Sequence, residues 1–96
     1  MTFTLTFTPE AASVPRRLKE EDDPRLKKIR KTLSLLETNP RHPGLATHEF
    51  TSLSGPSGEK VFEAYVENRT PGAWRVFWYY GPRPGMIRVL NITPHP

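Results

Sequence analysis

The stretch "AWRVFWYY", residues 73–80, decides the fold because its side chains alternate between two kinds of face. Successive side chains of a β-strand point to opposite sides of the sheet. One side of this strand is large and mostly apolar, and it holds Trp74, Val76, Trp78 and Tyr80. The other side holds Arg75, Phe77 and Tyr79. Because an unpaired guanidinium is costly to bury, we expect helices to cover the first side and Arg75 to face water or an anion.

Turn sequences flank this strand on both sides and predict two hairpins. The turn "RTPG" (69–72) separates it from "KVFEAYVEN" (60–68), which also alternates. The turn "GPRPG" (81–85) leads to a last strand, "MIRVLNI" (86–92). The second half of the chain is therefore predicted to be a three-stranded antiparallel meander.

The N-terminal stretch "TFTLTFT" (2–8) alternates threonine with apolar residues and predicts a further strand. Thr8 followed by Pro9 is a typical helix start, but Pro15 interrupts the pattern that follows. We therefore expect the first helix to be short or to begin only near Pro15. Residues 41–59 are predicted to be mainly loop, with a short strand around "THEFTSL" (47–53) as the exception.

The stretch "DDPRLKKIRKTLSLLETNP" (22–40) predicts the clearest helix of the chain. Asp23 can cap its start and Pro24 suits a first turn, while the Asn39-Pro40 pair ends it. Its apolar stripe has helical spacing and consists of Leu26, Ile29, Leu33 and Leu36. Together these elements predict a single α+β domain over residues 1–96, with one or two helices packed on one face of an antiparallel sheet.

Composition excludes several classes of protein. The chain has no cysteine, which rules out disulfides and thiolate metal sites, and its three histidines lack metal-ligand spacing, so we expect no metal and no cofactor. The N-terminus lacks the basic and apolar regions of a signal peptide, and no apolar run is long enough for a membrane helix. We expect a cytoplasmic location.

The net charge of +4 favours a polyanionic partner. Part of this charge lies on the outer face of the predicted second helix, where Lys27 and Lys31 are positioned to contact RNA phosphates. A merely solvated helix face is the commoner explanation of such a run.

A candidate reactive surface follows from the side of the sheet that carries Arg75. In the preceding strand Glu63, Tyr65 and Glu67 share one side, and a hairpin brings that side next to Arg75. Counting by twos from Asn91 also places His95 there if the chain stays extended. A base, an arginine and an acid are the groups that metal-independent RNA cleavage needs. The alternative is an ordinary Glu63–Arg75 cross-strand ion pair, worth ~0.2–1 kcal/mol.

The order of elements and three stretches resemble the RelE/ParE superfamily of bacterial toxins from type II toxin–antitoxin modules. The stretches are "LSLLETNPRHPGL" (33–45), "GAWRVFWYY" (72–80) and "VLNITPHP" (89–96). The resemblance implies the RelE-like fold, a cognate antitoxin as partner, and either cleavage of ribosome-bound mRNA or inhibition of DNA gyrase. The C-terminal tyrosine of many relatives has no counterpart after His95, so Tyr65 or Tyr79 would have to replace it.

Carried over to this sequence, the resemblance implies a role for each candidate residue. Glu63 matches a glutamate base, Arg75 a phosphate-binding arginine, and His95 a histidine acid. The residues expected to contact RNA are Tyr65, Phe77, Tyr79, Arg88, Lys27 and Lys31. The main hypothesis is therefore a ribosome-dependent mRNA endoribonuclease of the RelE/YoeB-like branch, with ribosome and mRNA as partners. The alternative is a ParE-like gyrase inhibitor or a non-enzymatic basic interaction module.

Overall fold

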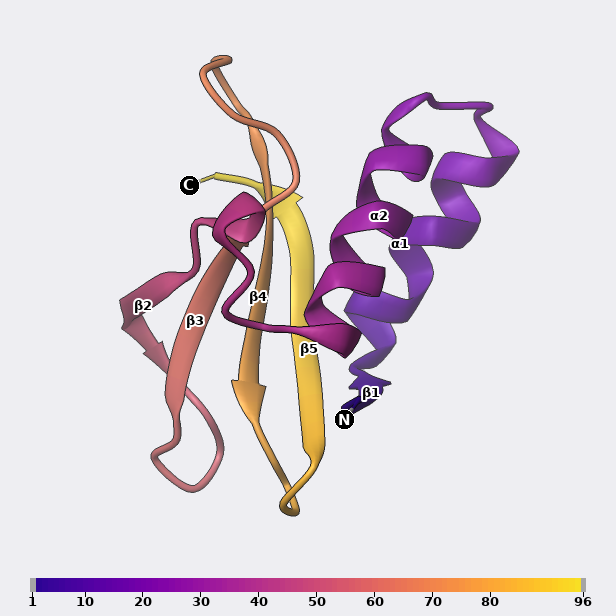
Figure 1. Ribbon diagram of the computed structural model, residues 1–96. Helices are drawn as coiled ribbons and strands as arrows, with labels where there is room; N and C mark the ends of the chain where they lie inside the picture. The colour runs from indigo at the N-terminus through magenta and orange to yellow at the C-terminus, as the bar shows by residue number, and fades with distance from the viewer. Residues whose placement is uncertain (1, 96) are drawn as a thin grey trace.

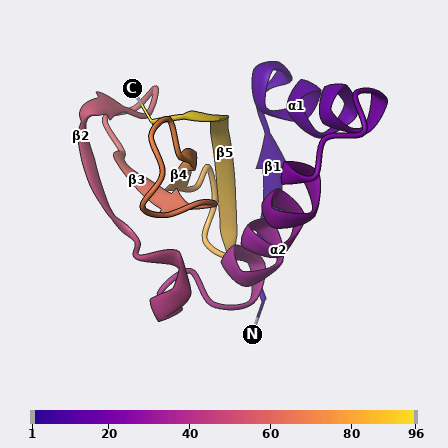
Figure 2. The same ribbon diagram turned by 90° about the horizontal axis from the view of Figure 1, so that it is seen from above.

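The computed structural model describes residues 2–95, which form two layers, a sheet and a pair of helices on one of its faces (Figure 1). The elements in chain order are β1 (Thr4–Phe7), α1 (Pro9–Glu20), α2 (Arg25–Thr38), the 3-10 helix η1 (Pro43–Leu45), β2 (His48–Ser54), β3 (Lys60–Tyr65), β4 (Trp74–Tyr80) and β5 (Met86–Pro94). Seen from above, the helices lie on one side of the sheet while β2 curls away at its other end (Figure 2). No helix within residues 2–95 is long and apolar enough to cross a membrane.

The α+β class and the hairpins of the second half are confirmed, but the sheet is larger than predicted. It has five strands in the order β1-β5-β4-β3-β2. The stretch around "THEFTSL" is a full strand, β2, so the antiparallel meander has four strands instead of three. The expectation of a purely antiparallel sheet is wrong, because β1 pairs with β5 in parallel. Parallel neighbours need a long crossover, which the helices and the meander supply here.

Helix α1 is longer than the sequence predicts, because it begins at Pro9 and continues through Pro15. A proline inside a helix removes one backbone hydrogen bond and costs ~3 kcal/mol or more. Three side chains with helical spacing offset that cost by burial against the sheet: Ala11, Val14 and Leu18. At the start of the helix, Thr8 Oγ1 accepts a hydrogen bond from the Ala11 backbone N–H.

Helix α2 lies where the sequence predicts it, although it begins at Arg25 with Pro24 at the N-cap position. Asp23, one residue earlier, still serves the first turn, because its Oδ1 accepts a hydrogen bond from the Arg25 backbone N–H at 2.9 Å. Within the apolar stripe, Leu26, Ile29 and Leu36 are buried and Leu33 is partly buried. The helix ends at Thr38, just before Asn39-Pro40.

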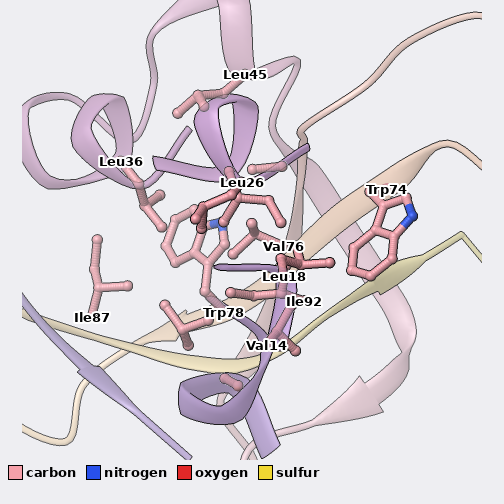
Figure 3. Packing of buried hydrophobic residues seen from close by; sticks show 14 residues of the cluster. Val14, Leu18, Leu26, Leu36, Leu45, Trp74, Val76, Trp78, Ile87 and Ile92 are labelled. Carbon is pink, nitrogen blue, oxygen red and sulfur yellow. The ribbon is translucent and has the colours of Figure 1, made fainter. Parts of the chain in front are cut away.

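The main core fills the space between the helices and the sheet, and Trp78 is its largest fully buried side chain (Figure 3). The predicted facing of β4 is confirmed, since Trp74, Val76 and Trp78 belong to this core. A smaller cluster lies on the opposite face of the sheet and consists of Val61, Phe77 and Tyr79, with Phe50 and Leu90 against it. Strand β2 thus covers part of the face that was expected to be open.

Thr8 ties the start of α1 to the sheet, because its hydroxyl also donates a 2.6 Å hydrogen bond to the Leu90 carbonyl oxygen. We predict that Thr8→Ala lowers the free energy of unfolding by about 1–2 kcal/mol, since the cap and this bond are both lost. Thr8→Ser keeps the hydroxyl and should retain most of the stability. Urea denaturation of both variants checks this, and equal losses for alanine and serine would contradict it.

Candidate active site

Glu63 on β3 is the centre of a polar cluster at the end of the sheet that carries the C-terminus. Its Oε1 atom lies 2.7 Å from His48 Nε2, and its Oε2 atom lies 3.4 Å from His95 Nε2. One carboxylate therefore stands between two imidazoles. We call these three residues the His–Glu–His cluster.

The strand register brings the cluster together. His48 on β2 is the direct pairing partner of Glu63 on β3, so their side chains share one face of the sheet. His95 follows the end of β5, and its backbone N–H donates a 2.8 Å hydrogen bond to the Ala73 carbonyl oxygen. This bond keeps the tail extended beside β4. The prediction that His95 lies on the same face as Glu63 is confirmed.

The cluster presents imidazoles, not a carboxylate, to solvent. The side chains of His48 and His95 are 48% and 46% exposed, whereas that of Glu63 is 1% exposed. The expectation that Glu63 would face solvent is wrong, because β2 and the C-terminal tail flank it. A buried carboxylate needs partners to offset its desolvation, and the imidazoles supply them.

The hydrogen-bond geometry of His48 links it firmly to Glu63. Its Nδ1 atom lies 3.0 Å from the Ala46 carbonyl oxygen while Nε2 faces the carboxylate. Both ring nitrogens thus face oxygen atoms, and these two contacts fix the orientation of the ring beside the carboxylate.

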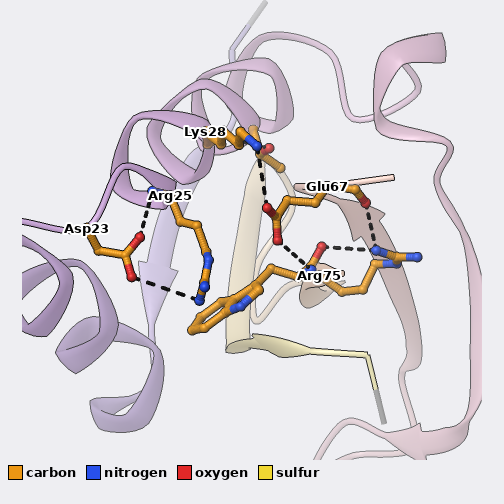
Figure 4. A network of polar contacts seen from close by, with 7 residues as sticks. Asp23, Arg25, Lys28, Glu67 and Arg75 are labelled. Carbon is orange, nitrogen blue, oxygen red and sulfur yellow. Dashed lines mark hydrogen bonds and ion pairs between the residues drawn. The ribbon is translucent and has the colours of Figure 1, made fainter. Parts of the chain in front are cut away.

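Arg75 lies on the predicted face of the sheet, but it is only 8% exposed instead of open to solvent. One of its terminal nitrogens donates hydrogen bonds to the carbonyl oxygens of Glu67 and Trp74, at 2.8 and 3.1 Å (Figure 4). The guanidinium carbon stands 3.7 Å from the ring centroid of Tyr65. Its Nε–H is buried and has no hydrogen-bond partner within residues 2–95, so the donors within reach of a ligand are those of the second terminal nitrogen.

The cross-strand ion pair between Glu63 and Arg75 does not form. Glu63 is opposite Phe77 in the register, and Arg75 is opposite Tyr65. Tyr65 instead connects the two groups, because its ring packs edge-on against His48 at 5.8 Å between centroids and also lies under the guanidinium. The arginine therefore belongs to the same continuous set of contacts as the His–Glu–His cluster.

Glu67 was expected beside Glu63, and the structure places it elsewhere. Strand β3 ends at Tyr65, so the alternation no longer sets its direction. Its carboxylate accepts the Trp74 backbone N–H at 3.2 Å and lies 3.4 Å from Lys28 Nζ on α2 (Figure 4). Glu67 thus fixes the β3–β4 loop whose carbonyl oxygen holds Arg75.

The remaining predicted RNA contacts differ in accessibility. Phe77 and Tyr79 are each 3% exposed in the smaller apolar cluster, so the expectation that their rings face solvent is wrong. Lys31 lines a cleft of about 330 Å³ together with Tyr65, at the edge of the site. Lys27 lies beside Asp23 and Arg30 in a separate hollow.

Arg88 lies on β5 next to β1, where it donates a 3.3 Å hydrogen bond to Thr6 Oγ1. Tyr79 is its pairing partner on β4, which places Arg88 on the same face of the sheet as the smaller apolar cluster. Among the predicted contacts, Tyr65 and Lys31 are therefore the two that adjoin the His–Glu–His cluster and Arg75.

His48 is the site residue that the sequence did not reveal. Its only signal was its position at the start of a weakly patterned strand, because the register with β3 cannot be read from the residues alone. Within residues 2–95, no group of three or more His, Cys, Asp or Glu side chains has the arrangement of a metal site.

The buried position of Arg75 makes it part of the fold. We predict that Arg75→Ala lowers the free energy of unfolding by about 1.5–3 kcal/mol, because two carbonyl oxygens lose a charged donor. Arg88→Ala is the matched control, since Arg88 is less buried and its bond to Thr6 is long; it should cost less than about 1 kcal/mol. Thermal and urea unfolding measure both variants. Equal stability of Arg75→Ala and the unmodified chain would contradict a structural role.

No protein-family model and no curated protein sequence matches this chain. Solved structures match along almost its whole length. A YoeB/ParE toxin from Agrobacterium tumefaciens has a TM-score of 0.71 at 12% identity, covering 97% of this chain and 99% of the other. RelE from the archaeal RelE–RelB complex of Pyrococcus horikoshii has a TM-score of 0.66 at 15% identity, covering 98% and 96%. YafQ from Escherichia coli has a TM-score of 0.65 at 13% identity, covering 97% and 93%. The chain therefore has the fold of the RelE, YoeB and YafQ toxins.

Proposed function

We propose that this protein is the toxin of a type II toxin–antitoxin system and that it cleaves mRNA on the ribosome. The observation that carries the proposal is the His–Glu–His cluster, in which two half-exposed imidazoles share one buried carboxylate. Paired proton donors and acceptors of this kind are what cleavage of RNA by its own 2′-hydroxyl requires. The shared fold of RelE, YoeB and YafQ supports the same function.

The proposed reaction moves two protons. In the first step Nε2–H of His48 donates to Glu63, while Nδ1 exchanges the Ala46 carbonyl oxygen for the 2′-hydroxyl and accepts its proton. The freed oxygen attacks the adjacent phosphorus. The bond from phosphorus to the 5′ oxygen breaks, and His95 donates a proton to that oxygen. The products are a 2′,3′-cyclic phosphate and a 5′-hydroxyl end. Glu63 thus keeps the predicted role of base, but through an imidazole that solvent can reach.

Arg75 and Tyr65 complete the proposed site. The buried guanidinium places a permanent positive charge beside the cluster, where charge develops on the phosphate in the transition state. The second terminal nitrogen, which neither backbone carbonyl engages, supplies the donors for a phosphate oxygen. Tyr65 positions the guanidinium and His48, and Lys31 extends the positive surface along the neighbouring cleft.

An antitoxin is the proposed protein partner. RelE has been solved with RelB, YafQ with DinJ, and YoeB with YefM. By the likeness of fold, we expect an acidic antitoxin to bind this basic chain and to block the cluster. The alternative function is gyrase inhibition, which the likeness to a YoeB/ParE toxin favours.

Cleavage should depend on Glu63 at the centre of the cluster and on His95 at one end. We predict that His95→Ala and Glu63→Gln each lower the rate of mRNA cleavage by ~10²–10⁴-fold, because each removes a proton donor or acceptor. Cells that express either variant should also escape growth arrest, to an extent that follows the loss of cleavage. The measurement is primer extension on mRNA from cells and from ribosome complexes with purified protein.

The matched control is Glu49→Gln, which changes an exposed carboxylate on β2 and should leave cleavage unchanged. Circular dichroism confirms that each variant is folded. If the protein arrests growth without cleaving mRNA and DNA gyrase loses its supercoiling activity, the nuclease hypothesis is rejected in favour of gyrase inhibition. Full cleavage by both cluster variants would reject this site.

A further inference from the structure

A second cavity adjoins the candidate active site on the opposite side of His48. Its volume is about 410 Å³, within the ~300–1,000 Å³ of typical small-molecule sites. It lies where residues 41–48 pass from α2 to β2 in front of β3 and β4. Its lining includes Arg41, His42, His48, Phe62, Trp78 and Tyr80.

Three aromatic rings form one wall of this cavity. Phe62 stacks on Trp78 with 5.0 Å between ring centroids, and Tyr80 meets Trp78 edge-on at 4.9 Å. Tyr80 is 40% exposed, an unusual position for a ring that belongs to an aromatic cluster. Trp78 itself is fully buried, so Tyr80 and the partly buried Phe62 offer the apolar surface on which a flat molecule can stack.

The same wall contains a polar group without a partner. Trp78 is fully buried, and its Nε1–H has no hydrogen-bond acceptor within residues 2–95. Buried indole N–H groups usually have a partner, because an unpaired one costs ~1–3 kcal/mol. Because this N–H is closed to solvent and its ring packs on Phe62 and Tyr80, its environment changes when those two rings move.

The opposite wall is held in place by the fold. Leu45 in this segment is fully buried in the main core, and Thr47 Oγ1 donates a 2.9 Å hydrogen bond to the Pro40 carbonyl oxygen. His42 Nδ1 accepts the Gly44 backbone N–H at 2.9 Å. The segment is thus anchored at both ends and in the middle, so the cavity exists before any ligand binds.

His48 is the link between the cavity and the proposed active site. Its Nε2 faces Glu63 in the cluster, whereas its Nδ1 faces Ala46, which also lines the cavity. The aromatic wall belongs to the helix-covered face of the sheet and the cluster to the opposite face, so RNA that reaches both passes around the edge strand β2 at His48. The exposed Arg41 adds a positive charge at the cavity wall.

We propose that this cavity binds one nucleobase of the RNA and gives the protein its base preference. The inference rests on the proposed function, because it assumes that RNA is the substrate. The base stacks on Tyr80 and Phe62, the two rings of the wall that are not fully buried, and Arg41 neutralises the attached phosphate. An apolar side chain of a partner protein would use the rings but not the arginine.

The indole N–H of Trp78 is a direct reporter of binding. The chain has two tryptophans, so Trp74→Phe assigns the two indole signals in a ¹⁵N–¹H NMR spectrum of the full chain. The probes are AMP, GMP, CMP and UMP, with ribose 5-phosphate as the control that lacks a base. We expect a saturable shift of the Trp78 signal with at least one nucleotide and none with ribose 5-phosphate.

Two variants test the contacts. Tyr80→Ala should weaken that nucleotide's affinity about 5-fold or more, in line with the loss of a stacking ring. The matched control is Leu53→Ala, which removes an exposed apolar side chain of β2 and should leave the affinity unchanged. If Tyr80→Ala is unfolded, Arg41→Ala replaces it and should weaken nucleotides without changing the spectrum of the free protein.

The outcomes separate this inference from the proposed function. Binding at the Trp78 signal needs no cleavage, so a base-selective shift supports the pocket even if the chain proves not to be a nuclease. If the protein cleaves mRNA but no nucleotide shifts the Trp78 signal, the nuclease function stands and the proposed nucleobase pocket is rejected. An equal shift with ribose 5-phosphate overturns it in favour of a phosphate site. A shift with purified antitoxin alone overturns it in favour of a protein side chain.

Discussion

The burial of one carboxylate is the constraint on which the site depends. Glu63 is almost fully removed from solvent, and a charge in that position is tolerated only with partners in good geometry. Those partners are 47 residues apart in sequence, His48 at the start of β2 and His95 just after β5. The pairing register of the strands therefore sets the geometry of the site. A slip of one residue in β2 would turn the His48 side chain to the other face of the sheet.

The arginine inside the aromatic strand has two roles that do not conflict. Its hydrogen bonds to the carbonyl oxygens of Glu67 and Trp74 close the β3–β4 loop, and the ring of Tyr65 lies beneath it. A guanidinium has five N–H donors, so one terminal nitrogen can serve the fold while the other remains for a ligand. The fold thus holds a permanent charge beside the cluster, and no carboxylate within residues 2–95 forms an ion pair with it.

Local patterns predicted the parts of the structure that depend on local physics. The two faces of β4, the span of α2 and its Asp23 cap, and the direction of His95 all follow from periodicity and turn chemistry. The parts that depend on distant partners were not predictable. The parallel pairing of β1, the continuation of α1 through Pro15 and the burial of Glu63 and Arg75 all arise from packing between segments far apart in sequence. His48 was missed because β2 has little alternation and its register is set by β3.

The central claim is that His48, Glu63 and His95 act as one unit, and a double-mutant cycle tests it most directly. The measurement is the rate of ribosome-dependent mRNA cleavage by His48→Ala, His95→Ala and the double variant. Residues that act together are strongly non-additive. The account predicts that the double variant is scarcely slower than the slower single variant. Losses that simply multiply, or a His48→Ala variant as fast as the unmodified protein, would contradict it.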